Sequence, residues 1–183
     1  ALFYLDELRR EGLIKNIGVT NFDSAHLRIA LSSGIKLVSN QICYSLLDRR
    51  ASGEMSEICQ EFDIKLFAFG TLAGGFLSKK WLGKKEPKIN DDLNWSQMKY
   101  KRFIDVTGGW KKFQSLLETL DDLSVRNNIS ISNISSRYIL EDPNVASVII
   151  GARLGESSHI KDNKKIYDVN FSEEDKKLLS KSL

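Results

Sequence analysis

Two kinds of hydrophobic pattern alternate along the first third of the chain. Short apolar runs are typical of buried strands, and segments whose apolar residues recur every three or four positions are typical of amphipathic helices. Because the two kinds alternate through short links, we expect parallel strands. The strands are expected at Ile14–Thr20, Leu37–Tyr44 and Ile64–Phe69, and the helices at about residues 1–10, 24–33 and 52–62.

The pattern then becomes irregular before it recovers. Residues 77–109 show no clean period and predict a long loop with short helical turns, a kind of segment that is usually functional or mobile in a compact domain. Further along, a strand is expected at Ala146–Ile150 and the last helix begins at Ser172. The other helices are expected at Trp110–Arg126, from a cap at Ser132 to Leu140, and at Glu156–Lys165.

Composition excludes several classes of protein. The chain has 183 residues, 42% hydrophobic and 28% charged, which is typical of one globular domain rather than a disordered chain. Its net charge of +3 is too small to indicate nucleic-acid binding, and no apolar run approaches the roughly 20 residues of a membrane span. We therefore expect neither a nucleic-acid partner nor a membrane partner.

The two cysteines, Cys43 and Cys59, are expected to be buried free thiols. Such thiols fit a reducing compartment, so a cytoplasmic location is expected, although an organelle is not excluded. A zinc site needs more ligands than two cysteines and two distant histidines offer, so no metal is assigned.

The chain opens at Ala1 inside a helical pattern, which suggests a piece of a longer protein. Its four predicted strands, each followed by a helix, are half of what an eight-stranded β/α barrel of about 250 residues uses.

Four segments in order resemble the aldo-keto reductases. They resemble the segments that form that family's fifth to eighth barrel strands and lie at Leu8–Phe22, Asn40–Arg49, Ala68–Gly75, and Val148–Arg153 with Ile160–Asn163. The resemblance implies an α/β fold, a partial (β/α)8 TIM barrel of four parallel β/α units corresponding to strands 5–8. Residues 1–183 would be the C-terminal half of that barrel, with the long loop at about 77–109.

The resemblance further implies that the chain binds NADPH (NADP) in an extended form. Thr20 and Asn21 stand where a Ser-Asn pair bonds the nicotinamide carboxamide, a task that Gln41 shares. Phe69 stands where an aromatic ring stacks on the nicotinamide, and stacking needs only the ring face.

The remaining cofactor positions follow the third and fourth strands. A loop of small residues would pass over the pyrophosphate, where backbone N–H groups can approach closely. That loop is Gly70, Thr71, Leu72, Ala73 and Gly74, and Lys80 matches a basic position near the phosphates. The adenosine end would be bound by Gly151 and Arg153, with His159, Asp162 and Asn163 around the adenine.

The chain departs from the family in three ways. Gly70-Thr71 replaces the commoner Ser-Pro, and the segment from Gly151 to Asn163 is slightly longer than usual. No residue matches the catalytic Asp, Tyr, Lys and His, which lie on the family's first four strands, so no catalytic residue is assigned.

Each assignment has a purely structural alternative. Asn21 is also a favoured helix N-cap, Gln41 can satisfy a neighbouring backbone group, and Phe69 can be an ordinary core aromatic. Lys80, Arg153 and His159 can be solvated surface residues.

Three hypotheses of function remain open. The first is the cofactor-binding half of an NADPH-dependent oxidoreductase that reduces an aldehyde or ketone, a small carbonyl substrate, to an alcohol. The second is a catalytically inactive nucleotide-binding or structural half-barrel. The third is an unrelated doubly wound α/β domain, which needs a reversal of strand order.

A half-barrel also implies a protein partner. Its open edges and apolar inner face would pair with the missing N-terminal half of the barrel or with a second copy of the chain. The residues expected on that inner face are Ile17, Val19, Val38, Ile42, Leu66, Ala68, Val148 and Ile150.

Overall fold

The computed structural model describes residues 1–88, 93–152, 155 and 158–183. Its centre is a four-stranded sheet with the order β1-β2-β3-β4, and every neighbouring pair is parallel. The order runs without reversal, which excludes the doubly wound alternative. The strands are β1 (Gly18–Thr20), β2 (Ser39–Cys43), β3 (Lys65–Phe69) and β4 (Val145–Ile149).

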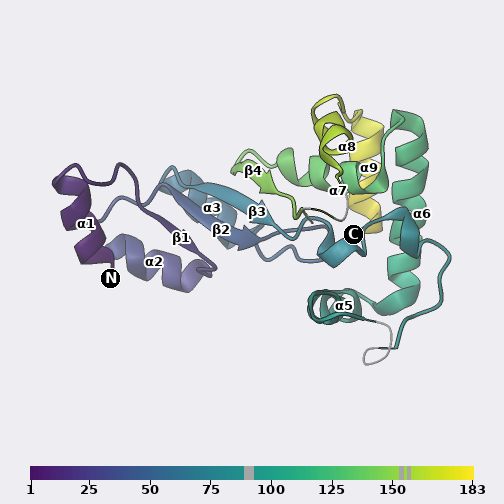
Figure 1. Cartoon of the computed structure of the whole chain (residues 1–183), viewed down its shortest axis with the longest axis horizontal. Helices are drawn as coiled ribbons and strands as arrows, with labels where there is room; N and C mark the ends of the chain where they lie inside the picture. The colour runs from purple at the N-terminus through teal and green to yellow at the C-terminus, as the bar shows by residue number, and fades with distance from the viewer. Residues whose placement is uncertain (89–92, 153–154, 156–157) are drawn as a thin grey trace.

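Three helices pack against one face of this sheet. They are α2 (Ser24–Ser32), α3 (Glu54–Glu61) and α7 (Ile131–Leu140), and they share a core with the strands. Leu27 of α2, Ile58 of α3 and Ile139 of α7 are almost fully buried there. The helix α1 (Leu2–Arg10) lies beyond α2 at the end of the molecule that carries the N-terminus (Figure 1).

The expected inner face of the sheet is wrong for six of its eight residues. Ile17, Ile42, Leu66 and Ala68 belong to the core beneath the helices, and the partly buried Val19 and Val148 pack against it. The opposite face carries the alternate residues of each strand, including Thr20, Gln41, Phe69 and Ile149, which are half-buried or exposed. In a β/α barrel the helices lie outside, and the strand residues that point away from them form the interior. Apolar alternation locates two faces but does not tell which one the helices cover.

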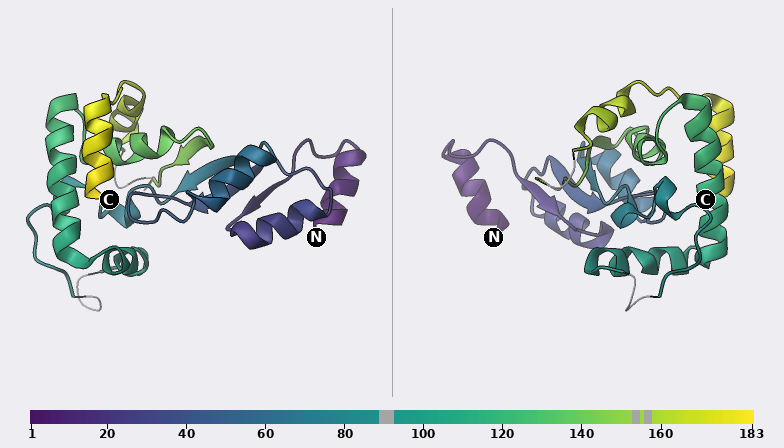
Figure 2. Two further views of the ribbon diagram at one scale, coloured as in Figure 1. Left: turned by 180° about the vertical axis from the view of Figure 1, so that it is seen from behind. Right: turned by 45° about the vertical axis from the view of Figure 1, so that its right-hand side comes forward.

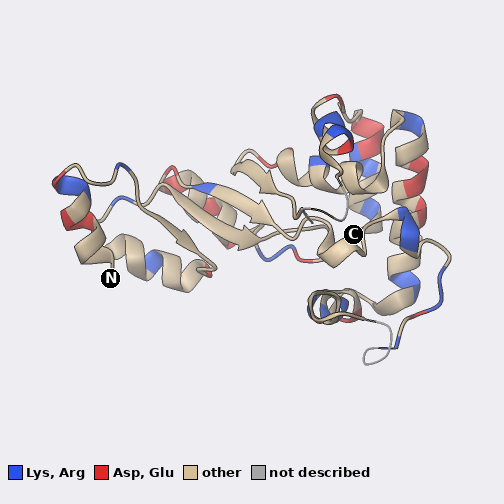
Figure 3. Cartoon of the chain, in the orientation of Figure 1, with Lys and Arg blue, Asp and Glu red and all other residues tan. Residues whose placement is uncertain are grey.

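A second core lies at the carboxyl ends of the strands, which point toward the cluster of later helices (Figures 1 and 2). The helix α6 (Gly109–Asn127) contributes the stripe Phe113, Leu116, Leu117, Leu120 and Leu123, all buried. The other elements at this end are η1 (Ala73–Gly75), η2 (Lys79–Trp81), α5 (Trp95–Val106), α8 (Ile160–Lys164), η3 (Lys165–Tyr167) and α9 (Glu173–Ser182). The sheet is nearly free of charged residues, which concentrate on the helices and loops (Figure 3).

The expectation of a loop over residues 77–109 is corrected by α5. This helix has 12 residues and begins with a capping box, in which Asn94 and Gln97 each bond the other's backbone N–H. Its buried positions are Tyr100, Lys101 and Ile104, so a lysine interrupts the apolar stripe. The lysine is buried because Glu86 and Asp105 pair with it, and that pairing is invisible to hydrophobic periodicity.

Two smaller predictions about helix ends also change. The N-cap of α7 is Ser130, whose hydroxyl accepts from the Asn133 N–H, while the Ser132 hydroxyl donates to the Leu77 carbonyl. The helix expected at Glu156–Lys165 begins only at Ile160 among the described residues, and Glu156 lies outside them. The cap at Ser172 is confirmed, with Asp175 completing a capping box.

Both cysteines are free thiols, Cys59 buried and Cys43 half-buried. Within the described part of the chain, no helix is long and apolar enough to cross a membrane. The same residues contain no group of three or more His, Cys, Asp or Glu side chains placed to hold a metal ion.

Candidate functional site

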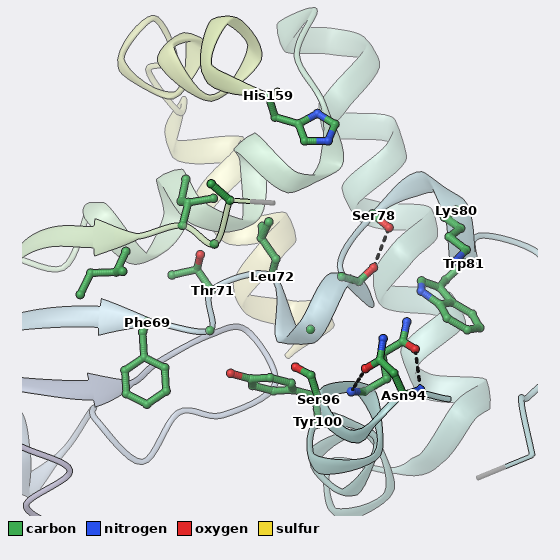
Figure 4. A pocket seen from close by; sticks show the side chains of 18 of the residues that line it. Phe69, Thr71, Leu72, Ser78, Lys80, Trp81, Asn94, Ser96, Tyr100 and His159 are labelled. Carbon is green, nitrogen blue, oxygen red and sulfur yellow. Dashed lines mark hydrogen bonds between the residues drawn. The ribbon is translucent and has the colours of Figure 1, made fainter. Parts of the chain in front are cut away.

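A cavity of about 1080 Å³ opens at the carboxyl ends of β3 and β4. One wall is the segment from Phe69 to Trp81, a second is the first half of α5, and a third is the end of β4 with His159 (Figure 4). Of the residues expected at a cofactor site, those lining this cavity are Phe69, Gly70, Thr71, Leu72, Gly74, Lys80, Gly151 and His159.

The loop after β3 has an unusual backbone. Gly70, Ala73, Gly74 and Gly75 all have positive φ, at 69°, 48°, 64° and 89°. Two turns fold it tightly, because the Ala73 N–H bonds the Gly70 carbonyl at 2.8 Å and the Gly75 N–H bonds the Leu72 carbonyl at 2.9 Å. Successive left-handed residues of this kind create concave backbone surfaces that suit anions.

Two backbone donors of this loop remain open. Among the described residues, the N–H groups of Thr71 and Leu72 have no backbone acceptor, and both residues line the cavity. The Thr71 hydroxyl lies 3.0 Å from the Ser136 hydroxyl in α7, and both side chains are buried. Thr71 therefore tethers the loop to α7 through its side chain. Ala73 is fully buried and does not line the cavity, because its methyl group belongs to the core.

The residues expected near the nicotinamide form a separate group at the ends of β1 and β2. Thr20 and Gln41 pair in register, and the Asn21 N–H bonds the Gln41 carbonyl at 2.9 Å. The Thr20 hydroxyl donates to the same carbonyl at 3.4 Å. None of these three residues lines the cavity. Thr20 and Gln41 lie on the open sheet face, as does Phe69 of β3, two strands away from β1.

Asn21 does not cap α2. The cap is Asp23, whose carboxylate accepts from the His26 N–H at 2.8 Å, while Asn21 itself has a φ of 57°. Asparagine tolerates this left-handed conformation better than most residues, which explains its presence locally without a capping role.

Phe69 stands at the inner end of the cavity beside polar groups from two elements. The ammonium of Lys99 in α5 lies 5.6 Å from the centre of its ring. Cys43, its register partner on β2, is close to Asp48 and Tyr100. Burial, then the Asp48 charge, raises the pKa of the Cys43 thiol to about 11. Burial, then Cys43, raises the pKa of Tyr100 to about 12, so both groups are neutral near pH 7.

Only some of the residues expected near the adenosine line the cavity. Gly151 and His159 line the cavity. Asp162 and Asn163 lie in α8 away from it, and the Asp162 carboxylate accepts from the Ser130 hydroxyl at 3.1 Å and pairs with Lys165 at 3.4 Å. Arg153 lies outside the described residues.

Lys80 supplies a cationic group at the outer wall. Its ammonium lies 5.4 Å from the Trp81 ring, whereas the neighbouring Lys79 points to Asp121 with a 2.9 Å ion pair. A cation, two open N–H groups and a cavity of this size fit a phosphate-containing ligand as large as a dinucleotide.

None of the site residues predicted from the sequence lies in α5, which builds one wall of the cavity. Asn94, Trp95, Ser96, Gln97 and Tyr100 all line the cavity. The Asn94–Gln97 capping box was the available signal, since Asn followed three residues later by Gln indicates a helix start.

The chain is similar to known proteins over its whole length. A family model described as the aldo/keto reductase family matches residues 1–183. The NADH-specific methylglyoxal reductase of Escherichia coli K12 is 26% identical over 175 residues, which are 96% of this chain and 50% of that enzyme. The flagellar radial spoke protein 5 of Chlamydomonas reinhardtii is 25% identical over 130 residues, 70% of this chain and 24% of that protein.

Solved structures show the same similarity. The thermostable aldo-keto reductase Tm1743, solved with the inhibitor epalrestat, superposes with a TM-score of 0.71 at 26% identity, covering 100% of this chain and 53% of that one. The glycerol dehydrogenase of Gluconobacter oxydans has a TM-score of 0.78 at 20% identity, covering 100% and 53%, and shares the fold. The chain spans about half the length of the methylglyoxal reductase and of these two solved proteins.

Proposed function

The chain belongs to the aldo/keto reductase family, and from that premise we propose that it is the cofactor-binding half of an NADPH-dependent carbonyl reductase. Its four β/α units take the place of barrel strands 5–8. The observation that carries the proposal is the cavity beside the loop 70–75, which Thr71, Leu72 and Lys80 line at the carboxyl ends of parallel strands. That end of the sheet is where β/α barrels place their active sites.

In the proposed complex the chain binds and orients the dinucleotide. The Thr71 and Leu72 N–H groups and the Lys80 ammonium bind the pyrophosphate, and Gly151, Arg153 and His159 the adenosine end. Asp162 and Asn163 do not line the cavity, so they contribute indirectly through α8, which follows His159 and is anchored by the bond from the Ser130 hydroxyl to Asp162. At the other end Thr20, Asn21 and Gln41 bind the carboxamide, and Phe69 presents its ring to the nicotinamide.

A bound nicotinamide supplies the hydride for reduction of an aldehyde or ketone. The proton must come from a residue outside this set, because the family's catalytic Asp, Tyr, Lys and His have no match here. We therefore propose that the acid is supplied by the N-terminal half of the barrel. The open sheet face, where Ile149 is 42% exposed, would be covered by that half.

The second candidate is a catalytically inactive nucleotide-binding or structural half-barrel, which pairs with another chain. It is favoured by Lys99, whose ammonium lies over the Phe69 ring where a nicotinamide would stack. It differs from the first candidate in needing no acid and turning over no carbonyl.

Calorimetric titration of the chain with NADPH and with NADH tests the shared part of both candidates. Tighter binding of NADPH than of NADH supports the proposed cofactor. Tighter binding of NADH would instead assign the cofactor named for the Escherichia coli relative. Binding of neither would contradict the proposal. Light scattering measures the mass of the chain in solution and so distinguishes the two proposed partners. A dimer would indicate that the chain pairs with a second copy rather than with an N-terminal half. Carbonyl reduction that appears only with an added N-terminal half separates the reductase from the inactive half-barrel.

A further inference from the structure

Tyr100 of α5 is wedged against two glycines of the loop 70–75 (Figure 4). A Cβ atom placed on Gly70 would lie 2.5 Å from the Tyr100 hydroxyl oxygen, and one placed on Gly74 would lie 2.7 Å from ring carbon Cδ2. Both distances are shorter than real Cβ contacts, so the two positions accept only glycine while Tyr100 is present. Glycine is therefore required at both positions for two reasons, the close contact with Tyr100 and the positive φ values.

The hydroxyl of Tyr100 lies near the end of the neighbouring strand. It interacts with the thiol of Cys43 at the end of β2, and Cys43 in turn interacts with Asp48. Asp48 is fixed by Arg50, whose Nε and Nη2 each donate to its carboxylate at 2.8 Å. The ring is only 7% exposed.

The helix that carries Tyr100 is anchored without help from the loop. Its first turn is closed by the Asn94–Gln97 capping box. Lys101, 3% exposed, pairs with Glu86 at 2.6 Å and with Asp105. Ile104 is fully buried in the core. Tyr100 is therefore presented to the loop from a fixed position.

We propose that Tyr100 is a positioning residue for the phosphate-binding loop. By filling the space behind Gly70 and Gly74, its ring holds the loop in the conformation that leaves the Thr71 and Leu72 N–H groups open. Glycine-rich backbone is otherwise free to sample many conformations, and ordering it on binding costs affinity. The inference rests on the proposed function. It assigns a role in cofactor binding to a residue that lies outside the loop 70–75.

The test compares three variants of the full chain. Tyr100→Ala removes the wedge, Tyr100→Phe keeps the ring, and Ile104→Ala removes a buried side chain from the same helix at a site away from the glycines. Each is titrated with NADPH and with inorganic pyrophosphate by calorimetry. Hydrogen exchange is measured in parallel at the Ala73 and Gly75 amides, which close the two turns of the loop.

We expect Tyr100→Ala to weaken binding of both ligands by about tenfold and to accelerate exchange at both amides. Tyr100→Phe should restore both properties to within about twofold of the parent, since the contact with the glycines is made mostly by the ring. Ile104→Ala should lower the melting temperature but leave affinity and loop exchange unchanged. If the effects of Tyr100→Ala came from a general loss of stability, Ile104→Ala would reproduce them.

Unchanged affinity and exchange in Tyr100→Ala would overturn the inference even if NADPH binds, and the proposed function would then stand alone. Conversely, if the parent binds neither ligand but Tyr100→Ala still accelerates exchange at Ala73 and Gly75, the positioning role stands and the proposed function fails.

Discussion

Thr71 of the cavity loop and Ser136 of α7 are joined by a hydrogen bond between hydroxyl oxygens 3.0 Å apart. Both side chains are buried, Thr71 at 1% exposure. Removing either hydroxyl leaves the other without a partner, which costs about 1–3 kcal/mol. We therefore expect Thr71→Val and Ser136→Ala each to destabilise the chain.

The double variant should cost less than the sum of the two singles, with a coupling of about 1 kcal/mol. Urea unfolding of the four proteins measures this cycle. Strict additivity would show that the two hydroxyls do not stabilise each other.

A second experiment distinguishes the proposed cofactor-binding role of Asn21 from the helix-capping role of Asp23. Asp23→Ala removes the N-cap of α2 and should cost about 1 kcal/mol of stability without changing cofactor affinity. Asn21→Gly keeps the left-handed backbone and removes the amide, so it should leave stability nearly unchanged while weakening NADPH binding. Thermal unfolding and calorimetric titration of both variants check this. Loss of stability without loss of affinity in Asn21→Gly would assign Asn21 a structural role.

The order of strands and helices was predictable, because short apolar runs and amphipathic stripes such as that of α6 reflect burial directly. The face of the sheet that the helices cover could not be predicted. Ile42 and Leu66 lie beneath the helices, but their apolar side chains would suit a barrel interior equally well. The helix α5 was missed because its buried Lys101 depends on Glu86 and Asp105, and such a pair has no hydrophobic signature.

The cavity was predictable only in part for a related reason. The loop 70–75 and Gly151 could be found from the family resemblance, which compares local segments. The contribution of Tyr100 depends on packing between α5 and the loop, which no local pattern contains.

The two thiols are expected to be poor nucleophiles at pH 8. Burial is the first cause that raises the pKa of Cys43 and of Cys59, each to about 11 from 9.0. Two pKa units reduce the thiolate fraction roughly a hundredfold, so iodoacetamide should label the native chain far more slowly than the urea-unfolded chain. Labelling of the native chain should rise about tenfold with each pH unit and level off only above about pH 11.

The same raised pKa values affect stability at high pH. Between pH 9 and 11 the unfolded chain loses thiol protons that the native chain retains, so the free energy of unfolding should fall across this window. A Cys59→Ala variant should show a shallower fall, which denaturation at a series of pH values measures. Identical slopes for parent and variant would contradict a raised pKa for Cys59.

Lys79 and Lys80 provide a matched pair for testing the phosphate site. The Lys80 ammonium lies at the cavity wall, whereas Lys79 forms a 2.9 Å ion pair with Asp121 on α6. Lys80→Ala should weaken binding of both NADPH and NADH by about tenfold, because a charge-assisted contact to the shared pyrophosphate is lost. Lys79→Ala removes the same charge from the chain but should leave both affinities unchanged. Titration at two salt concentrations is the check, since the Lys80 effect should shrink at high salt. Equal losses in the two variants would show that the net charge of the segment, rather than Lys80 at the cavity wall, attracts the cofactor.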